Sequence, residues 1–123
     1  MSRNIKDLTP EMQAKFNSFA MGMAAAAVDF IVTCTRRTQA EQEALFAQGR
    51  DKPGKIVTWT LKSKHIDGTA FDIVIMVNGK PDWNVTNPDW NLAGEIGEQA
   101  GLEWGGRWHK SPDFPHFQLR EVA

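Results

Sequence analysis

The sequence predicts a small α+β domain in which a mostly antiparallel sheet is flanked by about three helices. Three observations support this class. Apolar residues recur at helical spacing behind capping residues, short β-branched segments separate these stretches, and Asn78-Gly79, a dipeptide typical of hairpin turns, follows the most apolar segment. With 123 residues, the chain is long enough for a core that needs no disulfide. We therefore expect residues 1–123 to form a single domain.

Capping residues mark the start of each expected helix. Thr9 and Pro10 fit the N-cap and first turn of a helix, and a capping-box pattern over 38–41 opens a second helix that reaches about residue 48. A third helix is expected over 89–100, with Gly101 as its C-cap. The apolar positions expected on the first helix are Met12, Phe16, Phe19, Ala20, Met23 and Ala27. Those expected on one face of the third are Leu92, Ile96 and Ala100.

Strands are expected where β-branched and aromatic residues cluster or alternate. These segments are 30–35, 56–60, 69–77 and 116–119. Residues 80–88 are rich in proline and asparagine, so we expect turns there, and residues 102–108 contain too much glycine for a helix. The strand over 69–77 is the longest and most apolar, which makes it the expected centre of the sheet.

The charge balance argues against two classes of partner. Lys and Arg total 14 against 15 Asp and Glu, so there is no electrostatic reason to expect binding to nucleic acid or to an anionic membrane. Residues 1–10 lack the apolar core of a signal peptide, and the apolar stretch 21–28 is too short to span a bilayer. The single cysteine, Cys34, excludes an intramolecular disulfide. We expect a protein made in the cytoplasm without a signal peptide.

A carboxylate, Asp72, interrupts the apolar central strand, and its burial is costly unless a positive group meets it. His65 precedes it by seven residues, and Gly68 between them permits a turn that brings the two together. The tail offers Asp113 and His116. Two histidines and one carboxylate suit a catalytic zinc site whose fourth position is left for water, with Asp113 as the candidate base. A backbone or arginine partner for Asp72 is the alternative.

Three linked motifs resemble a known family. The segment Ser63-x-His65-x-x-Gly68-x-Ala70-x-Asp72 is followed by Trp104-Gly105-Gly106-x-Trp108 and then by Asp113-x-x-His116-Phe117. In this order the motifs resemble the LAS-type zinc peptidases of the M15 group. Within that group, the chain is similar to phage endolysins and bacterial enzymes that cut the L-alanyl-D-glutamate bond of peptidoglycan stem peptides. The resemblance covers about residues 32–119 and implies a LAS/hedgehog-like peptidase fold. Because few residues lie beyond the matched region, we expect no separate cell-wall-binding domain.

The resemblance also implies roles for matching residues. His65, Asp72 and His116 match the ligands of one catalytic Zn²⁺, and Asp113 matches the acidic general base. Arg37 matches the arginine that holds the substrate carbonyl as it becomes an oxyanion, a role that a fixed charge with forked donors suits.

Four further residues are candidates for substrate binding: Ser63, Arg36, Trp108 and His109. Arg36 stands where relatives often have an aromatic residue, so which of the two neighbouring arginines faces the site is open, with Arg37 favoured. Trp108 either floors the groove or fills the core. His109 lies in a polar loop and is expected to be exposed or to face the substrate rather than to bind the metal.

The resulting hypothesis is a monomeric zinc peptidase that binds the peptidoglycan stem peptide and hydrolyses its L-alanyl-D-glutamate bond. As an endolysin, it would be made in the host cytoplasm and act on the cell wall, in the periplasm, after release. Three alternatives stay open. The first is a D,D-carboxypeptidase or dipeptidase of the same fold, and the second is a non-catalytic cell-wall-binding module stabilised by zinc. The third is a cysteine hydrolase that uses Cys34 with His65.

Overall fold

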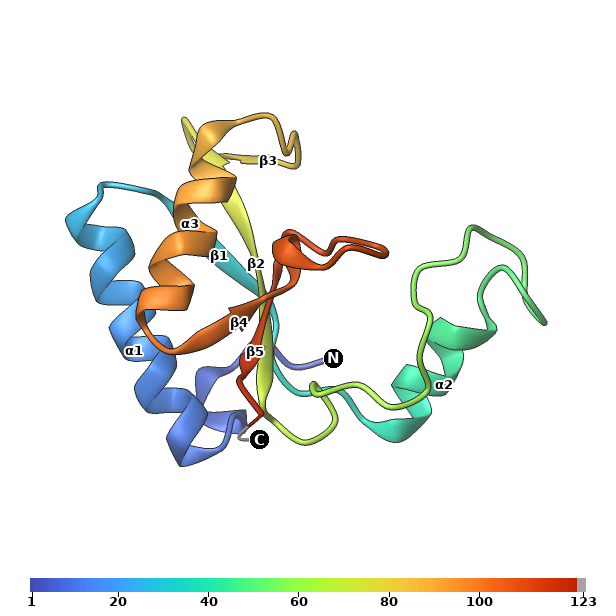
Figure 1. Ribbon diagram of the computed structural model, residues 1–123. Helices are drawn as coiled ribbons and strands as arrows, with labels where there is room; N and C mark the ends of the chain where they lie inside the picture. Colours follow the sequence, from blue (N-terminus) through green and yellow to red (C-terminus); the bar gives the residue numbers. More distant parts are fainter. Residues whose placement is uncertain (122–123) are drawn as a thin grey trace.

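The computed structural model describes residues 1–121 and contains a five-stranded antiparallel sheet, with α1 and α3 packed together against it (Figure 1). The strand order is β1-β2-β5-β4, and β3 pairs with the far end of β2. The helices are α1 (Pro10–Ala25), α2 (Gln39–Ala47) and α3 (Pro88–Gln99), with short 3-10 turns at Ile5–Asp7 and Gly105–Arg107. The strands are β1 (Phe30–Cys34), β2 (Ala70–Val77), β3 (Lys80–Asp82), β4 (Leu102–Trp104) and β5 (His116–Leu119). The α+β class is therefore confirmed.

The predicted helix starts are confirmed by their caps. The Thr9 hydroxyl accepts a hydrogen bond from the Met12 amide at the start of α1, and both hydrogen bonds of the capping box at Thr38 are present at the start of α2. These bonds satisfy amides that lack a partner within the helix. Helix α3 starts one residue before the predicted boundary, at Pro88, because Asn87 caps it.

Two of the apolar positions predicted on the helices are wrong. Ala27 lies beyond the end of α1 in a left-handed conformation, with φ 56°, and Val28 takes the buried position. Leu92 is 36% exposed, because the buried face of α3 is formed by Trp90, Ala93, Gly94, Ile96 and Gly97. Gly94 and Gly97 on that face let the helix backbone approach the Trp104 and Phe117 rings. Ile96 is buried and Ala100 partly buried, as predicted, so of the three positions predicted on α3 Leu92 is the wrong one.

The strand predicted over 56–60 is also wrong, because this segment has no regular secondary structure. Two short strands were missed. Residues 80–82, expected to form turns, pair as β3 with β2 through the hairpin at Asn78-Gly79, and residues 102–104 pair as β4 with β5. Each of these strands has three residues and depends on its partner, so its own sequence carries little signal.

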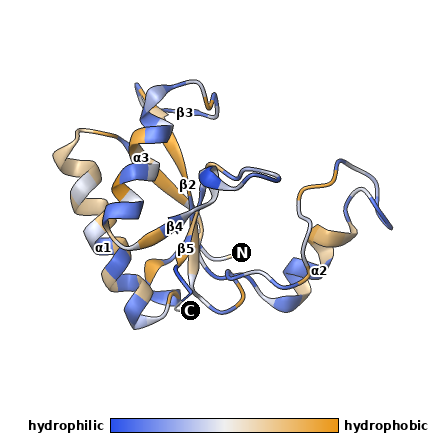
Figure 2. Cartoon of the chain, viewed as in Figure 1, coloured by the Kyte–Doolittle hydropathy of each residue, from blue (hydrophilic) through white to orange (hydrophobic). Residues whose placement is uncertain are grey.

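The core lies between the sheet and the two helices that pack on it. Its centre is a cluster of four phenylalanines from α1, β2 and β5: Phe16, Phe19, Phe71 and Phe117. Ring centroids of α1 lie 4.9 to 5.4 Å from those of β2 and β5, and the two strand rings, Phe71 and Phe117, stack at 5.4 Å. Figure 2 shows hydrophobic colour along β2 and again in the lobe formed by α2 and the loop that follows it. None of the helices within residues 1–121 has the length and apolar character needed to cross a bilayer.

The close contact of α3 with the sheet predicts the effect of a single methyl group. A Cβ at Gly94 would lie 2.3 Å from ring atoms of the buried Trp104. We expect Gly94→Ala to lower the free energy of unfolding by about 1–3 kcal/mol, despite the better helix propensity of alanine. Urea denaturation measures the change. Asn91→Ala, at an exposed position of the same helix, is the control and should not destabilise the protein. Equal stability of Gly94→Ala and the unchanged chain would contradict the packing described here.

Candidate active site

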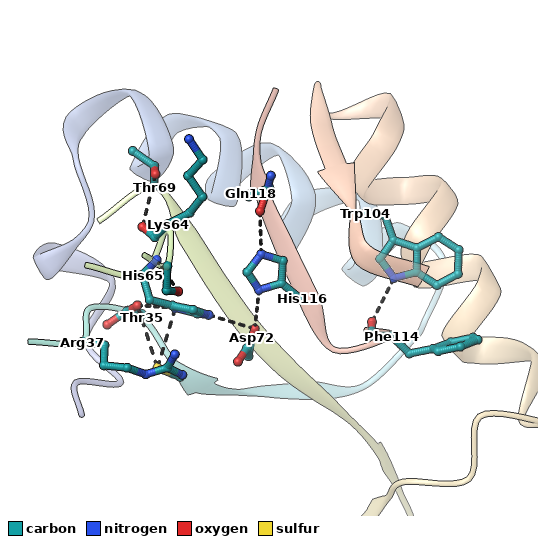
Figure 3. Close-up of polar contacts among 12 residues, drawn as sticks. Thr35, Arg37, Lys64, His65, Thr69, Asp72, Trp104, Phe114, His116 and Gln118 are labelled. Atoms are coloured by element: carbon teal, nitrogen blue, oxygen red, sulfur yellow. Dashed lines mark hydrogen bonds and ion pairs between the residues drawn. The ribbon is translucent and has the colours of Figure 1, made fainter. Parts of the chain in front are cut away.

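A groove of about 1110 Å³ collects the candidate site residues from distant parts of the chain. One wall is formed by the loop over 57–65, its floor by β2 and β5, and the other wall by the segment 108–113. His65, Asp72 and His116 meet in this groove, as Figure 3 shows. The structure therefore brings together the three residues expected to bind a metal, with Asp113 and Arg37 in the same groove.

Asp72 is the centre of this arrangement. Its Oδ1 atom lies 3.1 Å from His65 Nε2 and 3.1 Å from His116 Nδ1. The pairing of β2 with β5 sets Asp72 directly opposite His116. His65 arrives from the turn before β2, where Gly68 has φ 73° and lies against the backbone of residues 7–9. A side chain at Gly68 would be strained and crowded, so glycine is required for this turn.

Charge compensation shifts the pKa of both partners. Burial opposes protonation of His65, but hydrogen bonds and charge interactions with Asp72 and Cys34 outweigh it and raise the pKa of His65 to about 10. Burial also disfavours the charged form of Asp72, yet hydrogen bonds from His116 and His65 hold the pKa of Asp72 well below its ordinary value. The site thus holds a partly buried carboxylate whose negative charge favours a positive partner. Its oxygen and imidazole donors fit a divalent metal ion such as zinc.

The opposite edge of His65 is also fixed. Its Nδ1 lies 2.6 Å from the Thr35 carbonyl oxygen, and donation of the Nδ1 proton to that oxygen leaves Nε2 to face Asp72. A β-bulge at the end of β1 brings this carbonyl and the buried Cys34 beside the ring. Cys34 Sγ lies 3.7 Å from Nδ1. Ligand atoms of Cys34, His65 and Asp72 fall within 4.8 Å of one another, so Cys34 is a second candidate for the third ligand.

His116 is oriented by residues that sequence reasoning missed. Its Nε2 lies 2.8 Å from Gln118 Oε1, and Gln118 Nε2 donates to Glu103 at 3.2 Å. The indole of Trp108 donates to the same Glu103 oxygen at 2.9 Å. A protonated Nε2 that donates to Gln118 leaves Nδ1 for Asp72 or a metal. The sequence contained one signal for the role of Gln118. It lies two residues after His116 in the same strand, so both side chains are expected on the same side of the sheet.

Asp113 lies in the groove, half-buried, and burial raises its pKa. Its position depends on Gly105. The Asp113 amide donates to the Gly105 carbonyl at 2.9 Å, and a Cβ at Gly105 would lie 2.4 Å from the Asp113 carbonyl oxygen. The His116 amide in turn donates a hydrogen bond to the Asp113 carbonyl at 3.2 Å. The Trp-Gly-Gly segment therefore positions the turn that carries both Asp113 and His116.

The arginines and the remaining candidates separate into two groups. Arg37, Ser63 and Trp108 line the groove. Arg37 is held there by Gln42, whose Oε1 accepts from the Arg37 Nη1 at 2.7 Å. Arg36 and His109 are exposed and are not among the residues that line the groove. Of the two neighbouring arginines, Arg37 is thus the one that the fold directs toward Asp72 and Asp113.

Comparisons with known proteins agree with this arrangement. The peptidase M15 family model described as D-alanyl-D-alanine carboxypeptidase matches residues 57–119. The peptidoglycan L-alanyl-D-glutamate endopeptidase CwlK of Bacillus subtilis is 31% identical over 123 residues, which cover 92% of this chain and 74% of that protein. The L-alanyl-D-glutamate peptidase of Escherichia phage T5 is 34% identical over 92 residues, covering 70% of this chain and 64% of the phage protein.

A solved structure supports the same relationship. The crystal structure of the Serratia marcescens L-Ala D-Glu endopeptidase ChiX superposes with a TM-score of 0.77 at 26% identity, covering 95% of this chain and 84% of that one. The expected peptidase fold is therefore confirmed. The sequence match, the fold and the motifs that meet in the groove lead to one conclusion: this chain belongs to the peptidase M15 family.

Proposed function

We propose that this protein is a zinc peptidase that hydrolyses the L-alanyl-D-glutamate bond of peptidoglycan stem peptides. The observation that carries the proposal is the Asp72 carboxylate, held between two imidazoles in a groove that also contains Asp113 and Arg37. The choice of bond is supported by the relatives from Bacillus subtilis, phage T5 and Serratia marcescens, all of which are named for this activity.

The ligands that we assign to the metal are His65 Nε2, Asp72 and His116 Nδ1. Cys34 is the weaker candidate for two reasons. Its sulfur lies at the Nδ1 edge of His65, whereas Asp72 lies at the Nε2 edge. In addition, His65, Asp72 and His116 line the groove, whereas Cys34 is buried and does not. A catalytic ion needs a position open to substrate, which the three groove residues leave available.

When bound, zinc supplies Lewis acidity toward the scissile carbonyl and the attacking water. The residues of the chain carry the remaining steps. Asp113 takes a proton from the water and passes it to the leaving amine, a role that suits a carboxyl group whose pKa is raised by burial. Arg37, fixed by Gln42, offers charged donors to the oxygen on which negative charge develops.

A role as an endolysin extends this proposal. The phage T5 relative supports it, and the enzyme would then be made in the host cytoplasm and act as a monomer on the cell wall after release. A second candidate activity is that of a D,D-carboxypeptidase, which the description of the matching family model favours. The two activities give different products, because only the second releases free D-alanine.

Digestion of purified peptidoglycan tests the proposed reaction. The unchanged protein should produce stem peptides with a new D-glutamate amino terminus, detected by mass spectrometry, and a chelator should prevent this. Asp113→Asn should lower the rate by about 10²- to 10⁴-fold, because the proton shuttle is lost, while zinc content stays unchanged. Release of free D-alanine would instead favour the carboxypeptidase. Absence of any cleavage by the zinc-loaded protein would exclude both activities.

Replacement of each possible ligand tests the metal assignment. His116→Ala should lose zinc, measured by elemental analysis of the purified protein, because one of three ligands is gone. Cys34→Ser and His109→Ala should keep about one zinc ion per chain. The opposite pattern, with zinc lost from Cys34→Ser and retained by His116→Ala, would identify Cys34 as the third ligand in place of His116.

Gln118 gives a further prediction. Gln118→Leu removes the acceptor for His116 Nε2, so the ring is no longer held with Nδ1 toward the metal. We expect zinc affinity to fall by about 10- to 100-fold, the usual size of such effects. Competition with a chromogenic chelator measures the affinity. Gln99→Leu, on an exposed part of α3, serves as the control. If both variants bound zinc as tightly as the unchanged chain, Gln118 would have no orienting role.

A further inference from the structure

The loop over 56–61 exposes apolar side chains next to the site. Ile56, Val57, Trp59 and Leu61 are all exposed, and Trp59 reaches 68%. Val57 and Trp59 line the same groove as His65 and Asp72. Apolar side chains that gather in the open beside a groove are typical of an interaction site. The metal ligands and the proposed base do not require these side chains, so the mechanism leaves them unexplained.

The loop is fixed although it forms no strand. Side chains from α2 and from the turn after it donate hydrogen bonds to carbonyl oxygens of the loop and of the residue before it. These bonds are Gln39 to the Leu61 carbonyl at 3.2 Å, Gln42 to the Thr60 carbonyl at 2.7 Å, Gln48 to the Lys55 carbonyl at 3.0 Å, and Arg50 to the Thr58 carbonyl at 3.2 Å. Because its backbone is already ordered, the loop can bind a ligand with little loss of conformational entropy.

The Trp59 ring itself has a support on one side. The guanidinium carbon of Arg50 lies 5.6 Å from its ring centroid and 3.8 Å from that of Phe46. Arg50 is held in turn by hydrogen bonds to the Phe46 and Thr58 carbonyls. An anchored cation over an aromatic ring restrains the ring. Trp59 therefore presents a large flat surface that is both exposed and held in place.

We infer that Trp59 stacks against a sugar ring of the peptidoglycan glycan strand, next to the scissile bond. This inference rests on the proposed function and identifies the occupant by its chemistry. The stem peptide is built from alanine, glutamate and a diamino acid, whose side chains are small or charged and offer no large apolar surface. A saccharide ring presents a flat face of C–H groups that packs on an indole ring. The L-alanine of the stem peptide is joined directly to the lactyl group of N-acetylmuramic acid, so cleavage after this residue brings the sugar to the groove.

Two substrates that differ only in the sugar test the inference. One is a disaccharide-linked stem peptide and the other is the same peptide with a lactyl group on the L-alanine nitrogen but no sugar, so that both carry an amide there. Trp59→Ala should lower kcat/KM on the disaccharide-linked peptide by about tenfold, the size expected for one lost stacking contact, and leave the sugar-free peptide unchanged. Trp83→Ala is the matched control, because Trp83 is 57% exposed but lies outside the groove lining. It should change neither rate.

The possible outcomes separate this inference from the proposed function. An equal loss on both substrates, or no loss on either, would overturn the sugar contact while the peptidase activity stands. If the unchanged protein cleaves neither substrate, the proposed activity fails, and a binding measurement then decides about Trp59. In that experiment the N-acetylglucosamine–N-acetylmuramic acid disaccharide is added to the folded full chain, and NMR follows the indole N–H signals. A shift of the Trp59 signal, but not of the Trp83 signal, is expected. A Trp59 signal that stays in place would overturn the inference.

Discussion

The partial burial of one negative charge, that of Asp72, is the constraint on which the rest of the site depends. Asp72 lies on the central strand of the sheet, where an uncompensated carboxylate would cost several kcal/mol. Two imidazoles compensate this charge. His65 lies in the turn before β2, and His116 lies on the neighbouring strand β5. Each imidazole is then fixed on its far side, by the Thr35 carbonyl and by Gln118. The fold thus places positive or metal-binding groups where the carboxylate requires them.

This requirement explains why the sequence carried so much information about the site. A carboxylate within an apolar strand needs a partner, and His65, Gly68 and His116 were recognisable because their residue types are tied to that need. Helix starts were readable for a similar reason, since Thr9 and Thr38 satisfy amides within three residues of themselves. A cap of this kind can be recognised from the sequence because its donor and acceptor lie within one turn of each other. The assignment of a metal to these residues remains a prediction.

Features that depend on contacts between distant segments could not be predicted from the sequence. The three residues of β4 form a strand because they pair with β5. The hydrogen bond from Gln118 to Glu103 follows from the register of that pair, which a single sequence does not reveal. The exposure of Leu92 was not foreseen because Gly94 and Gly97 occupy the buried face of α3 against Trp104 and Phe117, two rings brought there by tertiary packing. The segment 56–60 has the composition of a strand, but its carbonyls accept hydrogen bonds from Gln42 of α2 and from Arg50 of the turn that follows this helix.

The hydrogen bonds that fix the loop over 56–61 affect how the rim of the groove can vary among related proteins. The residues that fix the loop backbone, Gln39, Gln42, Gln48 and Arg50, lie outside the loop, while Val57 and Trp59 inside it face the groove. Scaffold and recognition surface are therefore encoded at separate positions. Substitutions at the exposed positions can alter the rim of the groove without disturbing the chain path or the surroundings of Asp72. The rim can vary among related proteins while the residues beneath it stay constant.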